Sequence, residues 1–443
     1  MLTRSTRFHR AISILLLAGL ATSCTKSNVK NAPTPLVISA IAPGSGPFGT
    51  VVTISGTAFA TDTTKELVRF NGMTASIQSA TDTSLVVKVP QGAGTGTVTV
   101  IVNGDTATGP TFTYQLTVTV STLAGSGDPN VYGYTDGTGS AARFSEPEGV
   151  TVDAQGNVYV ADYLNNLIRK VTPAGVVTTL AGNPAQHGTV NGTGSAAEFS
   201  DPVGIAVDAQ DNLYVAEDAD IRKITPAGAV TTLSGNGTNG YVDGAGSTAE
   251  FNFPDALALD GAANIYVADF ANDVVRKITP AGVTSTLAGN GTYAWLDGVG
   301  TAAEFLGPTG MGIDGSGNLY TADYSDSHIR KITSSGTVST IAGNGQTGFA
   351  DGPGSSAEFN TPYSEAVDGK GNIYVSDQGN QRIRMITPSG TVSTLAGNGT
   401  KGHQDGPAAS AEFNFPYGIA TDAQGNVYVA DSYNNCIRKI TIQ

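Results

Sequence analysis

The chain has 443 residues, enough for two or three domains, and contains 57 glycines but only 14% charged residues. Such a composition is typical of many short strands joined by tight turns and argues against a helical protein. The formal net charge of −14, with no basic cluster to offset it, excludes nucleic acid as an expected partner because an acidic surface repels phosphate.

The chain begins with a segment typical of secretion. Arginines within the first ten residues precede the apolar run "AISILLLAGLA", which is too short to span a bilayer as a mature helix. The motif "ATSC" ends at Cys24 and resembles the lipobox of bacterial lipoproteins, although Ala21 stands where that family usually has leucine. The resemblance implies a signal peptide over 1–23 and lipidation of Cys24, with residues 24–35 as a flexible tether. The alternative is an ordinary secretory signal with a chance cysteine.

Residues 36–115 alternate apolar and polar positions in six short runs, among them "TVVTISGTAF", "SLVVKVP" and "GTVTVIVNG". This period of two, broken by Gly, Pro and Asn-Gly, predicts a β-sandwich. The series "IAPGSGPFGTVVTISGTAF…VRFNG…VKVP" resembles the IPT/TIG family of immunoglobulin-like domains. We expect this domain to serve as a stalk, because it contains no histidine and only scattered acids.

Residues 116–443 repeat one unit six times. The motif "GNVYVAD" and its variants place a tyrosine every 52 to 55 residues, at Tyr159, Tyr214, Tyr266, Tyr320, Tyr374 and Tyr428. Each unit predicts four strands, but the last lacks its fourth strand and an unpaired "VSTLAG" precedes the first. The sequence therefore predicts an all-β chain, a sandwich followed by a six-bladed β-propeller whose N-terminal strand completes the last blade. The consensus "PxGIAVDxxGNxYVADxxNxxIRKI" resembles the NHL-repeat family.

Features present in every blade are expected to stabilise the blade. The arginine of "IRK" and the acid of "YVAD" flank the same hairpin in each unit, which predicts one structural ion pair per blade. The "D-x-x-G-N" segments are typical of hairpin turns.

The long loops between units lie on the same face as the turns after "YVAD", because each strand reverses direction. We call this the loop face and expect it to bind a partner. Its loops carry a ring before "DG" in five of six units, and the shorter turns add Tyr163, Phe270, Tyr324 and Tyr433. The candidate rings are Tyr134, Tyr241, Trp295, Phe349 and His403, with Tyr293 beside Trp295. Flat rings suit stacking against sugars; the alternative is that each ring folds inward and pins its loop.

The inner strands vary most at the position after their first proline. This position reads Glu148, Val203, Asp255, Thr309, Tyr363 and Tyr417, and Glu365 replaces an otherwise aliphatic residue. We expect these side chains to crowd the mouth of the central channel. The acids and tyrosines, Glu148, Asp255, Tyr363, Glu365 and Tyr417, could hold a ligand or a cation there; solvated channel lining is the alternative.

The motifs of an enzyme are absent from the sequence. There is no nucleophile elbow, Cys/His dyad or phosphate-binding glycine loop, and His187, His328 and His403 fall in separate blades. We therefore predict no catalysis, no cofactor and no metal site, although propellers that resemble this one include metal-dependent lyases and lactonases. A weaker alternative is that two carboxylates at the channel mouth, Glu148 and Glu365, act as an acid/base pair.

The favoured function is a monomeric binding protein of the cell envelope, anchored in the membrane through Cys24. The outer membrane and its surface are the expected location, and a polysaccharide is the expected ligand of the loop face. The first alternative is a scaffold that binds an envelope protein, and the least favoured is a lyase or lactonase.

Overall fold

The computed structural model describes residues 33–443, which form two compact units. One contains Gly49–Thr113 and the segment up to Ser45; the other contains Gly46–Phe48 and Tyr114–Gln443. The predicted signal peptide, the lipidation site Cys24 and most of the predicted tether lie outside the described residues. Within residues 33–443, no helix is long and apolar enough to cross a membrane.

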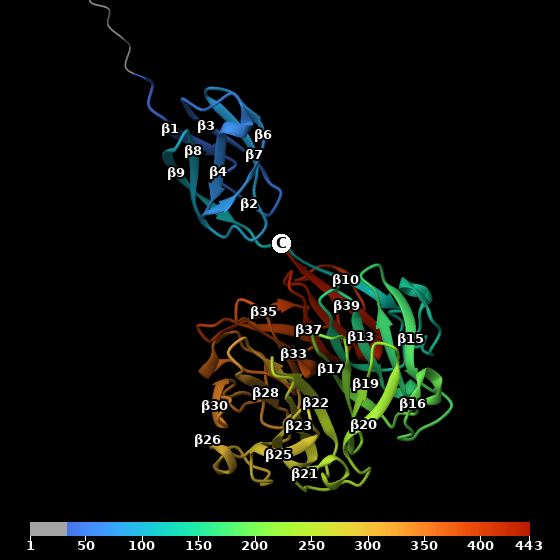
Figure 1. Ribbon diagram of the computed structural model, residues 1–443. Helices are drawn as coiled ribbons and strands as arrows, with labels where there is room; N and C mark the ends of the chain where they lie inside the picture. Colours follow the sequence, from blue (N-terminus) through green and yellow to red (C-terminus); the bar gives the residue numbers. More distant parts are fainter. Residues whose placement is uncertain (1–32) are drawn as a thin grey trace, which may run out of the picture. The chain divides into compact units, whose positions relative to one another are not determined.

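The first unit is a β-sandwich of two sheets (Figure 1). In order across one sheet the strands are β1 (Val37–Ala42), β3 (Val51–Thr57), β7 (Ser84–Lys88) and β6 (Ser76–Ala80). The other sheet contains β2 (Ser45–Gly46), β9 (Asp105–Tyr114), β8 (Gly96–Val102), β4 (Glu66–Phe70) and β5 (Met73–Thr74). Most inward residues of both sheets are buried, and Phe70 packs edge-on against Phe112 with ring centroids 5.1 Å apart. The alternating pattern of the sequence correctly predicted this sandwich.

The second unit is a β-propeller of six sheets, one per repeat (Figure 1). In the lists that follow, each blade's strands run from the channel outward. The first blade contains β12 (Pro147–Val152), β13 (Val158–Asp162), β14 (Leu167–Val171), β15 (Val176–Gly182) and β11 (Gly137–Thr138). The second contains β17 (Pro202–Val207), β18 (Leu213–Glu217), β19 (Asp220–Ile224), β20 (Ala229–Gly235) and β16 (Gly192–Thr193). The third contains β22 (Pro254–Leu259), β23 (Ile265–Asp269), β24 (Val274–Ile278), β25 (Val283–Ala288) and β21 (Gly244–Ala245).

The remaining three blades repeat this order. The fourth contains β27 (Gly312–Ile313), β28 (Leu319–Asp323), β29 (His328–Ile332), β30 (Thr337–Ala342) and β26 (Gly298–Val299). The fifth contains β32 (Pro362–Val367), β33 (Ile373–Asp377), β34 (Arg382–Ile386), β35 (Thr391–Ala396) and β31 (Gly352–Pro353). The sixth contains β37 (Pro416–Thr421), β38 (Val427–Asp431), β39 (Cys436–Ile442), β10 (Val118–Gly125) and β36 (Gly406–Pro407).

The sixth blade is closed by the N-terminal strand of the propeller. Strand β10 pairs antiparallel with β39, from Val118 opposite Ile442 to Gly125 opposite Cys436 (Figure 1). This confirms the predicted closure, which satisfies the edges of both strands. The two-residue fifth strand of each blade was not predicted. It arises because the long loop before a blade returns along the fourth strand and pairs with it, as Gly137 does with Val177.

The described residues contain only three-residue 3-10 turns as helical segments. One, η1 (Thr63–Lys65), belongs to the sandwich. Five lie in the long loops: η2 (Gly139–Ala141), η4 (Gly194–Ala196), η5 (Gly246–Thr248), η7 (Gly300–Ala302) and η8 (Gly354–Ser356). Four follow the second strand of a blade: η3 (Tyr163–Asn165), η6 (Phe270–Asn272), η9 (Gln378–Asn380) and η10 (Ser432–Asn434).

The turns between the first and second strands confirm the predicted hairpin chemistry. In the first blade Asp153 accepts hydrogen bonds from the backbone N–H groups of Gln155 and Asn157, at 3.0 and 2.8 Å. Gly156 has a φ of 82°, which glycine adopts without strain. The buried Tyr159 donates its hydroxyl to Asp153 at 3.2 Å, so the turn is tied to the blade core. These turns define the short-turn face of the propeller, opposite the loop face.

Candidate functional site

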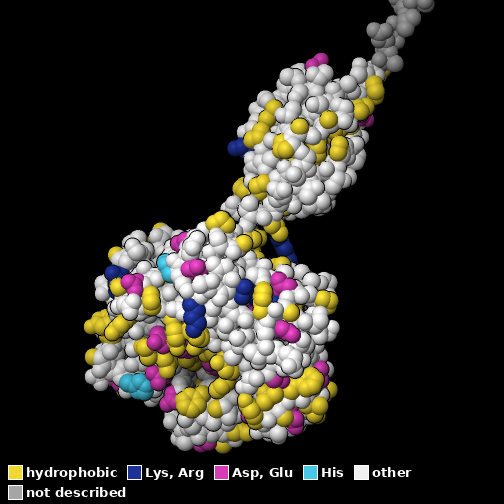
Figure 2. Space-filling model, turned by 180° about the vertical axis from the view of Figure 1, so that it is seen from behind, with side chains coloured by type: hydrophobic (Ala, Val, Ile, Leu, Met, Phe, Trp, Pro, Cys, Tyr) yellow, Lys and Arg dark blue, Asp and Glu magenta, His cyan; other side chains and the backbone are white. Residues whose placement is uncertain are grey.

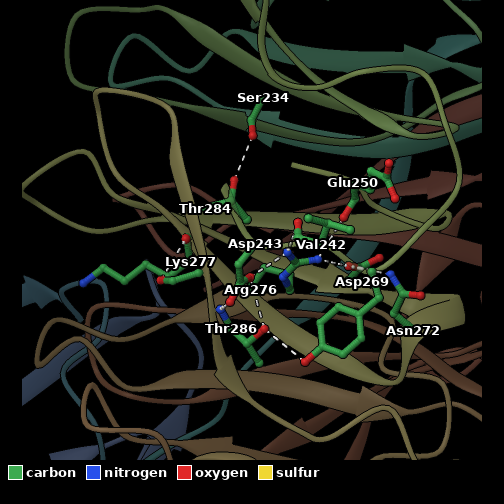
Figure 3. Close-up of polar contacts among 12 residues, drawn as sticks. Ser234, Val242, Asp243, Glu250, Asp269, Asn272, Arg276, Lys277, Thr284 and Thr286 are labelled. Atoms are coloured by element: carbon green, nitrogen blue, oxygen red, sulfur yellow. Dashed lines mark hydrogen bonds and ion pairs between the residues drawn. The ribbon is translucent and has the colours of Figure 1, made fainter. Parts of the chain in front are cut away.

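A fully buried arginine holds each long loop to its blade, as shown for the third blade in Figure 3. Arg276 donates from Nη1 to Asp269 Oδ2 at 2.7 Å and from Nη2 to Asp243 Oδ1 at 2.7 Å. The same guanidinium donates to the carbonyl oxygens of Glu250 and Val242 and lies over the ring of Phe251. A buried charge is costly unless it is paired in this way. This confirms the predicted ion pair and explains the "DG" motif, because its aspartate accepts from the arginine.

The other five blades build the same arrangement, which we call the arginine frame. Its arginines are Arg169, Arg222, Arg276, Arg330, Arg384 and Arg438. In the second blade Asn191 replaces the loop aspartate and Glu217 the strand aspartate, and both still accept hydrogen bonds from Arg222. The frame is therefore a property of the repeat.

Three of the predicted loop rings contact a threonine of their own blade. Tyr241 forms a hydroxyl hydrogen bond with Thr286 at 3.1 Å, and Trp295 donates from Nε1 to Thr340 at 3.0 Å. His403 is 2.8 Å from the Thr122 hydroxyl. These threonines belong to the fourth strand of each blade, and in the third blade Thr286 also donates to the "DG" aspartate. The contacts match the alternative in which the rings pin the loops.

The remaining rings of this set lie at the outer rim as well. Phe349 packs under the guanidinium of Arg382, whose carbon is 3.9 Å from the ring centroid. Tyr134 and Tyr293 are exposed, at 57% and 61%. Trp295 also stacks on His328, with centroids 4.8 Å apart. Among the described residues no two of the six rings are in ring contact, so their role in ligand binding stays a prediction.

The three histidines have separate surroundings. His187 pairs with Asp201 at 3.3 Å, and His328 pairs with Asp326 at 2.9 Å. Burial lowers the pKa of His403. Within residues 33–443, no group of three His, Cys, Asp or Glu side chains is arranged to hold a metal ion.

The inner-strand residues converge at the channel mouth, as expected. The hydroxyl of Tyr363 in the fifth blade donates to Asp255 Oδ1 of the third blade at 2.7 Å, across the channel. The ring of Tyr363 packs against Tyr417 with centroids 4.4 Å apart and lies edge-on to Tyr324 at 6.2 Å. Glu148 lines one small cavity together with Asp255 and Tyr363. These tyrosines and acids thus form one cluster, which we call the channel mouth.

The channel mouth encloses little space. Its cavity measures about 50 Å³, which suits a few water molecules and is too small for a sugar ring. Burial raises the pKa of Asp255 to about 6. Burial also raises the pKa of Glu148 well above its usual range, and the nearby Asp255 carboxylate adds to that shift. A sugar-sized ligand must therefore bind outside this cavity.

A larger groove lies on the loop face where the first and sixth blades meet. It measures about 420 Å³ and is lined by Pro129, Tyr132, Ser145, Glu146, Leu164, Asn414, Tyr433 and Asn435. We call it the seam groove. Tyr132 is 67% exposed and Tyr433 is 40% exposed. Tyr433 packs on Phe415 with centroids 4.6 Å apart, so its ring is held in place while part of it faces solvent. In Figure 2, hydrophobic side chains with acidic ones among them surround a hollow on one side of the propeller.

The seam groove exists because one loop departs from the repeat. The segment from Gly125 to Gly137 is three residues longer than its counterpart from Gly235 to Gly244, and it contributes Pro129 and Tyr132. Sequence reasoning named Tyr433 but missed Tyr132, Leu164, Asn414 and Asn435. The extra length of this loop was the signal that could have found Tyr132.

The groove floor is fixed by a hydrogen bond between blades. Asn435 accepts from the backbone N–H of Glu146 at 2.9 Å and donates to the carbonyl of Pro129 at 3.3 Å. Equivalent bonds join other blades, as when Asn166 accepts from the N–H of Asp201 at 3.2 Å. We call these the blade staples. In the closing pair the staple also holds the longer loop.

The residues that precede the inner-strand prolines have left-handed backbone conformations. They are Glu146, Asp201, Phe253, Gly307, Thr361 and Phe415, with φ between 47° and 70°. Only one is glycine, so five positions bear the strain that a side chain meets in this region. These five positions carry side chains on the loop face. Glu146 lines the seam groove, and Phe415 packs against Tyr433, which also lines it.

Comparison with known proteins identifies both parts of the chain. The IPT/TIG domain family model matches residues 36–114, and the NHL repeat family model matches residues 144–171 and 413–440. The chain therefore contains an IPT/TIG domain and NHL repeats.

Solved structures share this architecture. A protein of unknown function from Bacteroides thetaiotaomicron is 24% identical with a TM-score of 0.66, over 93% of this chain and 99% of the other. An auxiliary nutrient binding protein from the same organism is 20% identical with a TM-score of 0.57, over 93% of this chain and 98% of the other.

Curated relatives match part of this chain. The Arabidopsis thaliana protein SUPPRESSOR OF QUENCHING 1, chloroplastic, is 29% identical over 282 residues, which cover 59% of this chain and 27% of that protein. The chain thus spans about a quarter of the length of that relative.

Proposed function

We propose that this protein is a non-catalytic binding protein that holds a carbohydrate in the seam groove of its propeller. The observation that carries the proposal is the pairing of exposed rings with hydrogen-bonding groups in one groove. Tyr132 and Tyr433 offer apolar faces, and Asn414 and Glu146 offer an amide and a carboxylate beside them.

This combination suits the chemistry of a sugar. The C–H face of a sugar ring stacks on an aromatic ring, while its hydroxyls exchange hydrogen bonds with amides and carboxylates. Covering roughly 100 Å² of ring at about 25 cal/mol per Å² contributes about 2.5 kcal/mol, less the cost of ordering. The groove of about 420 Å³ falls within the size range of small-ligand sites. Two stacked rings would give weak binding to a short glycan and stronger binding to a polymer.

Binding, as opposed to catalysis, is supported by the described fold. An auxiliary nutrient binding protein shares the architecture across nearly the whole of both chains. The proposal includes the membrane anchor at Cys24 in the cell envelope and a monomeric state. In this arrangement the IPT/TIG domain is the stalk and the propeller meets the ligand.

The test is a calorimetric titration of the purified protein with a panel of polysaccharides and their oligosaccharides. Tyr132→Ala and Tyr433→Ala should each weaken the retained carbohydrate at least tenfold. Tyr134→Ala is the matched control, because it removes an exposed tyrosine from the same loop but outside the groove. It should change the affinity less than threefold.

Two outcomes would reject the proposal. One is equal loss of affinity in all three variants, and the other is no binding by any carbohydrate. If an envelope extract then yielded one stoichiometric protein partner that Tyr132→Ala fails to retain, the groove would serve as a protein-interaction surface.

A further inference from the structure

A ring of six inner-strand side chains lies between two cavities of the central channel and lines both of them. Five are aliphatic or methionine and nearly buried: Val150, Ile205, Leu257, Met311 and Ile419. The sixth is Glu365, which is only 2% exposed. Neither carboxylate oxygen of Glu365 has a partner at hydrogen-bonding geometry. A buried carboxylate in this state is costly, so its retention needs an explanation.

Glu365 lines two cavities. Above it is the small cavity of the channel mouth, which it shares with Glu148 and Asp255. Below it is a cavity of about 230 Å³ that reaches the short-turn face. The lower walls are formed by the ends of the inner strands: Val152, Val207, Leu259, Ile313, Val367 and Thr421. The wall of the lower channel thus combines aliphatic side chains with polar groups of the strands, and a carboxylate lies at its inner end.

The charges around Glu365 are all negative. Asp255 Oδ2 is also buried without a hydrogen-bond partner. Among the described residues that line the two cavities, none is lysine, arginine or histidine. Burial raises the pKa of Glu365 to about 8; the carboxylates of Asp255 and Asp323 add to this shift, and the peptide group of Ala322 opposes it. The channel therefore lacks a positive group at its centre.

The entrance on the short-turn face is acidic as well. Each inner strand is followed directly by a turn aspartate: Asp153, Asp208, Asp260, Asp314, Asp368 and Asp422. Although burial raises the pKa of Asp208, hydrogen bonds from Asn212 bring it below the usual value. Lysines such as Lys170 lie over the tyrosine of the neighbouring strand and partly offset these charges. The ring of carboxylates favours the approach of a cation.

We propose that the lower channel binds a primary alkylammonium group, which enters from the short-turn face and places its charged end against Glu365. The aliphatic side chains in this wall suit a methylene stem, and an ammonium group brings three donors to unpartnered carboxylate oxygens. From Val367 to Glu365 is two residues, or about 7 Å along a strand, close to the reach of a four-carbon stem. A metal ion fits less well, since the described acids form no metal-binding group.

This site is independent of the proposed carbohydrate groove, because it opens on the other face. The same chemistry occurs in a free polyamine and in a lysine side chain of a protein. Both sources present a charged end on a flexible apolar stem, so the experiment includes one probe for each.

The experiment is a calorimetric titration of the full protein with 1,4-diaminobutane, and with 1,4-butanediol as the uncharged counterpart. A short lysine-containing peptide represents the protein source. Wild type is compared with Glu365→Leu, which restores the aliphatic ring and should leave the fold intact. The control is Glu358→Gln, which removes one negative charge from the same blade outside both cavities.

The diamine or the peptide should bind wild type at least tenfold more tightly than the diol. Glu365→Leu should bind these amines at least tenfold more weakly than wild type, and Glu358→Gln should change the affinity less than twofold. Binding of the peptide alone would identify a protein lysine as the source. The proposal is overturned if neither amine binds wild type at millimolar concentration, or if Glu365→Leu binds them equally well. Carbohydrate affinity of Glu365→Leu should match wild type, so the two proposals fail separately.

Discussion

The arginine frame and the channel both bury charged groups, but they treat them in opposite ways. In the frame, each fully buried arginine is paired with a strand carboxylate and a loop Asp or Asn, and the arrangement recurs in all six blades. In the channel, Glu365 occurs in one blade and its oxygens lack partners. The seam groove likewise depends on one longer loop. Repetition therefore marks what holds the propeller together, and departures from it mark where a ligand is expected.

The largest expected effect comes from breaking the frame. Arg276→Met would leave Asp269 buried without its partner and free the loop aspartate, which should cost about 3–5 kcal/mol in the free energy of unfolding. Chemical denaturation measures this loss. Lys277→Met, on the same strand but partly exposed, is the control and should cost less than about 1 kcal/mol. Similar losses of stability in Arg276→Met and Lys277→Met would mean that the arginine frame contributes little to the stability of the propeller.

The channel carboxylate should have the opposite effect on stability. The folded-state pKa of Glu365, about 8, exceeds the ordinary value of 4.5, so the folded chain binds more protons between these values. Its contribution to stability is fully present below pH 4.5 and is lost as pH rises through about 8. Glu365→Leu should therefore be more stable than wild type by about 1–3 kcal/mol at pH 8.5, and by less at pH 5. Thermal melts across this range test the sign, and a larger gain at pH 5 would contradict it.

The blade staples allow a matched comparison between the seam and an ordinary blade contact. Asn435→Ala and Asn166→Ala each remove an acceptor from a backbone N–H, and each should cost about 1–2 kcal/mol. Only Asn435→Ala should weaken carbohydrate binding, because Asn435 lines the seam groove. Paired unfolding and binding measurements separate the two effects. Loss of binding in Asn166→Ala would show that the groove responds to blade packing in general.

The smallest effect is expected at the outer rim. Tyr241→Phe removes one partly exposed hydrogen bond to Thr286 and should cost about 0.5–1 kcal/mol without changing carbohydrate affinity. Chemical denaturation of this variant measures the change in stability, and titration measures its carbohydrate affinity. A clear loss of carbohydrate affinity would indicate that the rings at the outer rim take part in binding.

The sequence allowed the repeat and its closure to be predicted because both depend on local, repeated patterns. The tyrosine spacing and the unpaired "VSTLAG" determined the six blades and the pairing of β10 with β39. The convergence of Tyr363 with Asp255 also followed, since inner strands of a propeller share one axis. The hydrogen bond from the Tyr363 hydroxyl to Asp255 could not be predicted from the sequence, because it joins two residues that are 108 positions apart.

The seam groove could not be derived from the repeat. Its walls come from both ends of the propeller, Pro129 and Tyr132 before the first blade and Tyr433 and Asn435 in the last. Rings with the same sequence context also have different partners, because Tyr241 and Trp295 form hydrogen bonds with threonines whereas Phe349 packs against Arg382. Periodicity shows which residues recur, whereas exposure depends on contacts between distant segments.

Hydrogen exchange, with and without the carbohydrate retained in the titrations, tests the central claim most directly. The account predicts added protection in residues 129–132 and 433–435, which contribute to the seam groove, and none in the loops of Tyr241 and Trp295. Equal protection in all six long loops, or protection confined to the rim rings, would contradict it. That result would place recognition in the repeated part of the propeller.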